Sequence, residues 1–161
     1  MTDVRNTPAK KTPPTYFTFA SSTGPIELAA RLDLPAGLPR GYALLVHGFT
    51  CSMDLAITRR IAEGLAGEGL AVFRFDLPGH GKSGGEFSQS NFTDYRAAVL
   101  AAVAYMREQY VAPTVLVGHS LGGAAILAAA GEIPEATAIA TIGTPANVAE
   151  VVRLVGASPD E

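Results

Sequence analysis

The chain has 161 residues, a formal net charge of −3 and 48% hydrophobic residues, which is enough for one domain with a buried core. This charge balance argues against a nucleic-acid partner, since no basic cluster exceeds Lys10 and Lys11. The single cysteine, Cys51, excludes an internal disulfide and suits a reducing compartment. Without a secretory leader or an apolar run of about 18 residues, we expect a cytoplasmic protein with no membrane span.

Residues 1–14, rich in proline, lysine and threonine, predict a flexible tail, and residues 15–161 predict part of one domain. The first two predicted strands alternate polar and apolar residues around a turn, which is typical of an antiparallel pair. The later predicted strands are continuous apolar runs, which are typical of parallel strands buried on both faces. In chain order, the predicted strands are residues 16–19, 26–32, 43–46, 72–75, 114–117 and 138–142.

Helices are predicted between the later strands, where apolar residues recur at helical spacing. In the first helix Ile57, Ile61 and Leu65 form one stripe, and Asn91 is a candidate N-cap for the second. The predicted helices are residues 55–68, 92–110, 121–130 and 148–155. Strands that alternate with helices need right-handed crossovers, so we predict an α/β fold with a mostly parallel sheet and helices on both faces.

The segment Gly118-His119-Ser120-Leu121-Gly122 lies between an apolar strand and a helix rich in small residues. Gly-x-Ser-x-Gly in this context is typical of a sharp strand-to-helix turn that presents a nucleophilic serine. The turn would hold Ser120 in a strained backbone conformation, and side chains at Gly118 and Gly122 would collide with their surroundings. The alternative, a chance match in a loop, does not explain the flanking strand and helix.

The segment His47-Gly48-Phe49 follows the predicted strand at 43–46, so it should lie at the same sheet edge as Ser120. We predict that the backbone N–H groups of Phe49 and Leu121 form an oxyanion hole, with Gly48 allowing close approach. His47 is expected to brace this loop, with a role as catalytic base as the alternative. His119, next to the serine, is expected to point away from it.

A third loop, Asp76 to Ser83, follows the strand at 72–75. Its glycines predict turns and Asp76 predicts a cap for loop amides, whereas the spacing does not fit a phosphate-binding loop. We expect His80 at the rim of the site. The three histidines lie on separate loops without ligand spacing, so we predict neither a metal site nor a cofactor.

The sequence supplies no conventional base for Ser120. Serine hydrolases of this fold place an acid and then a histidine after the nucleophile, but His47, His80 and His119 all precede Ser120. We therefore expect the chain to be the N-terminal part of a longer enzyme, with the acid and histidine beyond residue 161.

These motifs resemble the α/β-hydrolase superfamily across residues 16–161. Within it, the chain is most similar to the N-terminal hydrolase domain of bacterial proteins that also carry a C-terminal OsmC-like domain. The resemblance implies a serine hydrolase that acts on small carboxylic esters, with Ser120 as nucleophile and Phe49 and Leu121 as oxyanion donors. The residues that carry it are 47–54, 73–76, 84–87 and 118–123.

A second hypothesis is that the chain is a catalytically inert fold fragment or an interaction module. It follows from the missing base, and it predicts an exposed sheet edge at residues 138–142. An unpaired apolar edge favours association, so this hypothesis includes dimerisation through that edge.

Overall fold

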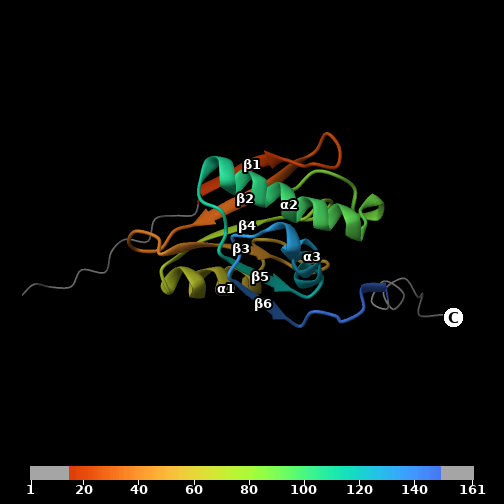
Figure 1. The fold of residues 1–161 in the computed structure, drawn as a ribbon. Coiled ribbons are helices and arrows are strands. Elements are labelled where there is room, and N and C mark those ends of the chain that lie inside the picture. The colour runs from red at the N-terminus through yellow and green to blue at the C-terminus, as the bar shows by residue number, and fades with distance from the viewer. Residues whose placement is uncertain (1–14, 150–161) are drawn as a thin grey trace, which may run out of the picture.

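The computed structural model describes residues 15–149 of the chain, which form one six-stranded sheet with helices on its faces (Figure 1). The predicted tail at 1–14 and residues 150–155 of the last predicted helix lie outside this range. The strands are β1 (Thr15–Ala20), β2 (Glu27–Asp33), β3 (Gly41–Val46), β4 (Leu70–Phe75), β5 (Val115–His119) and β6 (Ala138–Ile142). The α-helices are α1 (Ala56–Gly67), α2 (Phe92–Gln109) and α3 (Leu121–Ala129).

The strand order across the sheet is β1-β2-β4-β3-β5-β6. The pairs β1–β2 and β2–β4 are antiparallel, whereas β4, β3, β5 and β6 run parallel to one another. This confirms the predicted antiparallel opening and the mostly parallel sheet. It also brings the carboxyl ends of β3, β4 and β5 to one edge, where α/β folds hold their functional loops.

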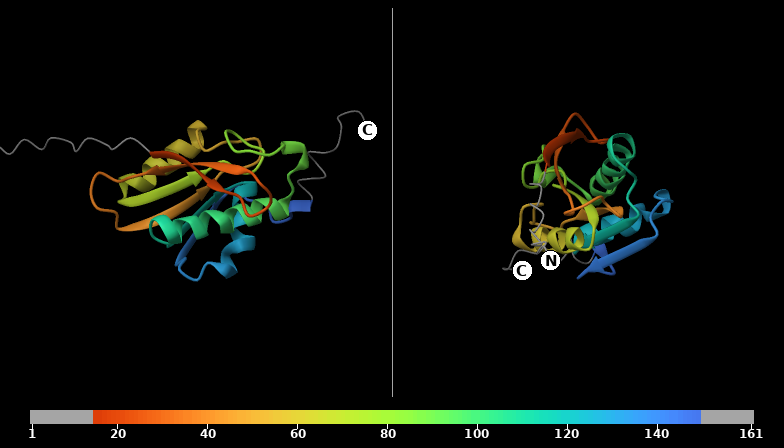
Figure 2. Two further views of the ribbon diagram at one scale, coloured as in Figure 1. Left: turned by 90° about the horizontal axis from the view of Figure 1, so that it is seen from above. Right: turned by 90° about the vertical axis from the view of Figure 1, so that its left-hand side faces the viewer.

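The two faces of the sheet carry separate apolar cores, because successive side chains of a strand point to opposite sides. Leu44 and Val46 pack in the larger core, with α2 and α3, whereas Ala43 and Leu45 pack in the smaller core under α1. The end-on view of Figure 2 shows α1 and α2 on opposite sides of the sheet. Burial on both faces explains why β3 is a continuous apolar run.

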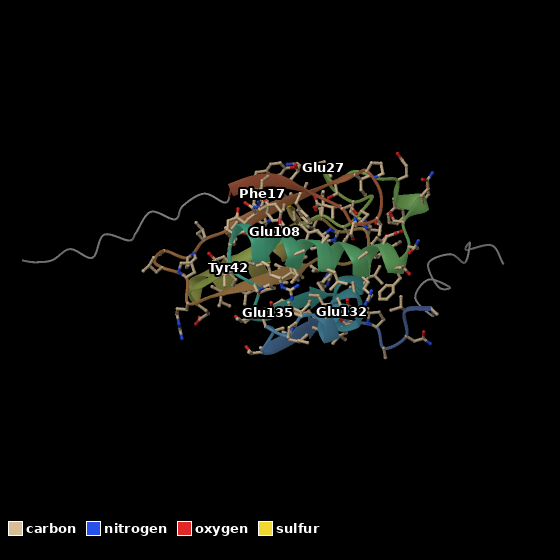
Figure 3. The ribbon with its side chains drawn as sticks, turned by 45° about the horizontal axis from the view of Figure 1, so that its top comes forward. Phe17, Glu27, Tyr42, Glu108, Glu132 and Glu135 are labelled. Atoms are coloured by element: carbon tan, nitrogen blue, oxygen red, sulfur yellow. The ribbon has the colours of Figure 1, made fainter. Side chains whose placement is uncertain are left out.

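Two short 3-10 helices, Phe87–Gln89 and Ala130–Glu132, were not predicted, because three residues are too few to show a periodic pattern. The second begins the connection from α3 to β6. Ion pairs join this connection to the surface of α2. Arg96 pairs with Glu132, and Arg107 binds both carboxylate oxygens of Glu135 at 2.8 Å. Figure 3 shows both glutamates on this connection, beside α2.

Strand β6 lies at the edge of the sheet, and all five of its residues are exposed. Within residues 15–149, its only strand partner is β5. The exposed edge predicted at residues 138–142 is therefore present, while dimerisation through it stays a prediction. None of the helices in this range is both long and apolar enough to cross a bilayer.

The N-terminus of α2 generates a prediction about stability. The Asn91 side chain accepts a hydrogen bond from the Asp94 amide, and the Asp94 carboxylate accepts one from the Asn91 amide. Asn91→Ala should therefore lower the free energy of unfolding by about 1 kcal/mol in urea denaturation. The exposed Thr93 caps nothing, so Thr93→Ala should cause no loss, and equal losses in both variants would contradict the role of the cap.

Candidate active site

Ser120 lies in the tight turn that joins β5 to α3. Its φ of 52° and ψ of −123° place a non-glycine residue in the left-handed region, where a side chain strains the backbone. The surrounding bonds hold this conformation: the Ser120 amide donates to the Ile142 carbonyl at 2.8 Å, and its carbonyl accepts from the Gly123 amide at 3.0 Å. The strained turn predicted from the sequence is therefore present.

The turn depends on backbone contacts that a side chain would block. A Cβ on Gly118 would overlap the backbone of Gly123, because the end of β5 passes directly against the first turn of α3. A Cβ on Gly122 would overlap the carbonyl oxygens of Val46 and His47, at the end of β3. The first turn of α3 is therefore in direct backbone contact with the ends of β5 and β3.

Gly123 was not singled out from the sequence, although a Cβ there would overlap the Thr144 side chain. Thr144 also donates from Oγ1 to the Ser120 carbonyl at 3.2 Å. The Gly122-Gly123 pair in the sequence was the signal that could have identified Gly123 as a closely packed position.

The loop after β3 lies directly against Ser120. A Cβ on Gly48 would lie only 2.8 Å from the Ser120 Cβ, so only glycine allows this approach. In the described part of the chain, the amides of Phe49 and Leu121 donate to no backbone or side-chain acceptor, and the Ser120 hydroxyl has no hydrogen-bond partner. Two free N–H groups and the half-buried Ser120 therefore lie next to this contact.

His47 is 1% exposed and bonds to two loops. Its Nδ1 donates to the Gly48 carbonyl at 2.8 Å, and its Nε2 accepts from the Leu77 amide at 3.0 Å. Burial lowers the pKa of His47 from 6.5 to about 4, so the ring is neutral at pH 7. The 3.6 Å approach of Nε2 to Asp76 is therefore not an ion pair, and both ring nitrogens are already engaged.

His80 lies beside the site, against the rings of His47 and Phe49, but it is only 5% exposed and belongs to an aromatic cluster. Its Nδ1 donates to the Pro78 carbonyl, and its ring packs edge-to-face against Phe87 and Tyr95. His119 lies against the glycine loop, since a Cβ on Gly48 would come within 3.0 Å of its Nδ1. That nitrogen is buried and has no hydrogen-bond partner among residues 15–149.

Two buried charged side chains form hydrogen bonds with the backbone of Met53, which lies four residues after Phe49. Asp76 accepts hydrogen bonds from the amides of Met53 and Lys82, as expected for a carboxylate that caps loop amides, and burial raises its pKa. Arg74 donates to the Met53 carbonyl and binds both oxygens of Asp33. Arg74 was not predicted as a functional residue, although a lone charge in an apolar strand indicates a buried ion pair.

Groups of three or more histidine, cysteine or acidic side chains that would suit a metal ion do not occur in the described range.

Residues 37–157 match the model of a protein family described as serine aminopeptidase, S33. Human monoglyceride lipase is 35% identical over 109 residues, which cover 66% of this chain and 35% of that protein. A monoacylglycerol lipase of Mycolicibacterium smegmatis is 28% identical over 141 residues, which cover 84% of this chain and 49% of that protein. The chain thus spans at most about half the length of these two relatives.

Solved structures share the same fold. The esterase domain of a Rhodothermus marinus protein is 43% identical with a TM-score of 0.70, and the match covers 87% of this chain and 54% of that one. Est1E from Butyrivibrio proteoclasticus, solved with ferulic acid bound, is 27% identical with a TM-score of 0.78, over 89% of this chain and 60% of that one.

The close packing around Ser120 predicts that Gly118→Ala is destabilising. The added methyl would meet the backbone of Gly123, which cannot move aside, so the free energy of unfolding should fall by about 1–3 kcal/mol. Gly64→Ala, in the open interior of α1, is the matched control and should stabilise by about 0.5–1 kcal/mol. Thermal or urea unfolding measures both, and a neutral Gly118→Ala would show that the turn is loosely packed.

Burial of His47 predicts a pH-dependent stability. Its pKa is about 4 when folded and 6.5 when exposed, so between these values the unfolded chain binds the extra proton. Stability should therefore fall as the pH drops from 6.5 to 4, by up to about 3 kcal/mol from this group. Urea unfolding across this range should show a shallower pH dependence for His47→Gln. Asp76 is present in both proteins, so the difference isolates His47, and identical slopes would refute its buried neutral state.

Proposed function

Because the chain belongs to the serine aminopeptidase S33 family of α/β-hydrolases, we propose that the full-length protein is a serine hydrolase acting on carboxylic esters. Ser120 is the nucleophile. The amides of Phe49 and Leu121 form the oxyanion hole, and His47, Gly48, Gly118, His119 and Gly122 support the site. The histidine base and its acid partner come from a segment outside these 161 residues.

The observation that carries this proposal is the contact of Gly48 with Ser120. It puts the loop bearing the Phe49 amide beside the serine, while Leu121 follows the serine directly at the N-terminus of α3. Helix N-termini leave their first amides without intrahelical partners. Two unused donors near a nucleophilic hydroxyl can stabilise the negative oxygen of a tetrahedral intermediate when both point at that oxygen.

The reaction would proceed in two steps. The Ser120 oxygen attacks the ester carbonyl carbon while a histidine takes the hydroxyl proton, and the resulting oxyanion is held by the two amides. Collapse expels the alcohol, which receives that proton, and leaves an acyl-enzyme. Water then attacks the acyl group in the same way and releases the carboxylic acid. Each amide would contribute about 3 kcal/mol to lowering the barrier.

The need for an outside base follows from the contacts of the three histidines. His47 has both ring nitrogens bonded to backbone groups, and His80 is buried among aromatic rings. His119 precedes Ser120 directly, and its Nδ1 lies against the Gly48 loop. No histidine follows Ser120 in the sequence. A cytoplasmic location and an OsmC-like domain further along the full-length protein stay predictions.

The preference for esters rests on the relatives, whose names include monoglyceride lipase and esterase. The alternative is that these residues act alone as an inert interaction module. The uncovered edge strand β6 favours it, because an exposed apolar strand readily pairs with another chain.

The proposal predicts covalent labelling of the full-length protein by a fluorophosphonate, which reacts with activated serines. Ser120→Ala should abolish labelling and reduce ester turnover by at least about 1000-fold, because the acyl-enzyme can no longer form. Ser88→Ala, at an exposed serine in a 3-10 helix, is the control and should change neither readout.

An intact, folded protein that does not label would overturn the serine mechanism. Ester turnover by residues 1–161 alone, lost in Ser120→Ala, would instead refute the external base and return attention to His47 and His80.

A further inference from the structure

A cavity of about 510 Å³ opens at the sheet edge opposite Ser120. Its walls are the connection between β2 and β3, one face of α1 from Arg59 to Gly67, and the turn into β4. In Figure 1 this end of the molecule lies to the left, whereas the arrowheads of β5 and β6 point to the right. The cavity is therefore separate from the proposed ester site.

The lining of this cavity carries an excess of positive charge. Four arginines line it, against two acidic residues, Asp33 and Glu63. Asp33 is already neutralised, because Arg74 binds both of its carboxylate oxygens. That pair forms the buried part of the lining. Arg31 pairs with Asp54 at 3.2 Å, so Arg40 and Arg59 remain against Glu63 alone.

Two of these guanidinium groups have no ion-pair partner in the described part of the chain, namely those of Arg40 and Arg59. The stem of Arg40 packs across Gly69, where a Cβ would lie 2.9 Å from the Arg40 Cδ. The Arg40 amide also donates to the Gly69 carbonyl at 2.8 Å. The backbone and the aliphatic stem of Arg40 are thus held in place, so this side chain loses little conformational entropy when it binds a ligand.

Arg31 also lines the cavity, and Asp54 already supplies a carboxylate for it. Its Nε lies 3.2 Å from an oxygen of Asp54 without hydrogen-bond geometry, and it is buried with no other partner among residues 15–149. Asp54 supplies the opposing charge but no hydrogen bond to Nε, so an anionic ligand in the same cavity would add one to this guanidinium.

The rim of the cavity is apolar. Leu38 lines the cavity and is 95% exposed, between Gly37 and Pro39 in the connection from β2 to β3. Ala36 is also exposed in this connection, whereas Pro35 lines the cavity from a buried position and Leu34 packs partly against the larger core. A ligand that fits both the guanidinium groups and this rim must join an anionic head to a short apolar group.

We propose that this cavity binds a small organic anion, a carboxylate or a phosphate monoester with a short alkyl chain. Arg40 and Arg59 bind the anionic group, and Leu38 covers the alkyl chain. Guanidinium groups suit both anions, because their paired N–H donors match two oxygens of either head group. The proposal does not depend on the ester hydrolase function.

Isothermal titration calorimetry of the full chain tests the site with hexanoate, hexyl phosphate, inorganic phosphate and hexanol. At least one of the two alkyl anions should bind, and hexanol should not. Binding of only one assigns the head group as carboxylate or phosphate, whereas binding of both assigns shared anion recognition. Inorganic phosphate should bind at least tenfold more weakly than hexyl phosphate if the latter binds.

Variants distinguish binding in this cavity from general electrostatic attraction of anions to the protein surface. The double variant Arg40→Gln/Arg59→Gln should weaken binding at least tenfold, whereas Arg60→Gln, an exposed arginine of α1 outside the cavity, should change it less than twofold. Glu63→Gln removes the opposing carboxylate and should tighten binding. The absence of binding by both alkyl anions, or equal losses in the double variant and Arg60→Gln, would overturn the proposal.

Discussion

Direct contact between backbones at the β5–α3 turn is the constraint on which the candidate site depends. Gly118 meets Gly123, Gly122 meets the end of β3, and Gly48 meets Ser120. Each contact needs a residue without a side chain, because a Cβ would fall inside the neighbouring backbone or the serine itself. The strained φ of Ser120 persists because these contacts and the bond to Ile142 leave it no alternative.

The loops around this turn are held mainly by buried polar groups. Arg74 and Asp76, one residue apart on either side of the end of β4, bind the carbonyl and the amide of Met53. Burying such charges is costly, and the cost is met only when each one is paired and hydrogen-bonded. Arg74 meets that condition through Asp33, and Asp76 through two loop amides. The loop that carries Phe49 is therefore tied to β2 and β4, and through Asp33 to the cavity at the far edge.

Burial also decides whether a histidine near Ser120 can act as a base or has only a structural role. A base must be able to take a proton near neutral pH, and burial opposes this for His47 by lowering its pKa to about 4. Its two backbone bonds join the loop after β3 to the loop after β4. A histidine close to a serine in the fold is thus not by itself a base.

Local patterns in the sequence determined the six strands, the three described α-helices and the strained turn at Ser120, since periodicity, capping and glycine spacing all act over a few residues. The capping box at Asn91 and the Ala138–Ile142 strand are examples. Only the tertiary structure decided which segments, distant in the sequence, lie against one another. The bond of Arg74 to Asp33 spans 41 positions, and the burial of His80 depends on Phe87 and Tyr95 from other segments. Such contacts leave no periodic trace, because they depend on strand order and on how loops from distant segments pack at a shared edge.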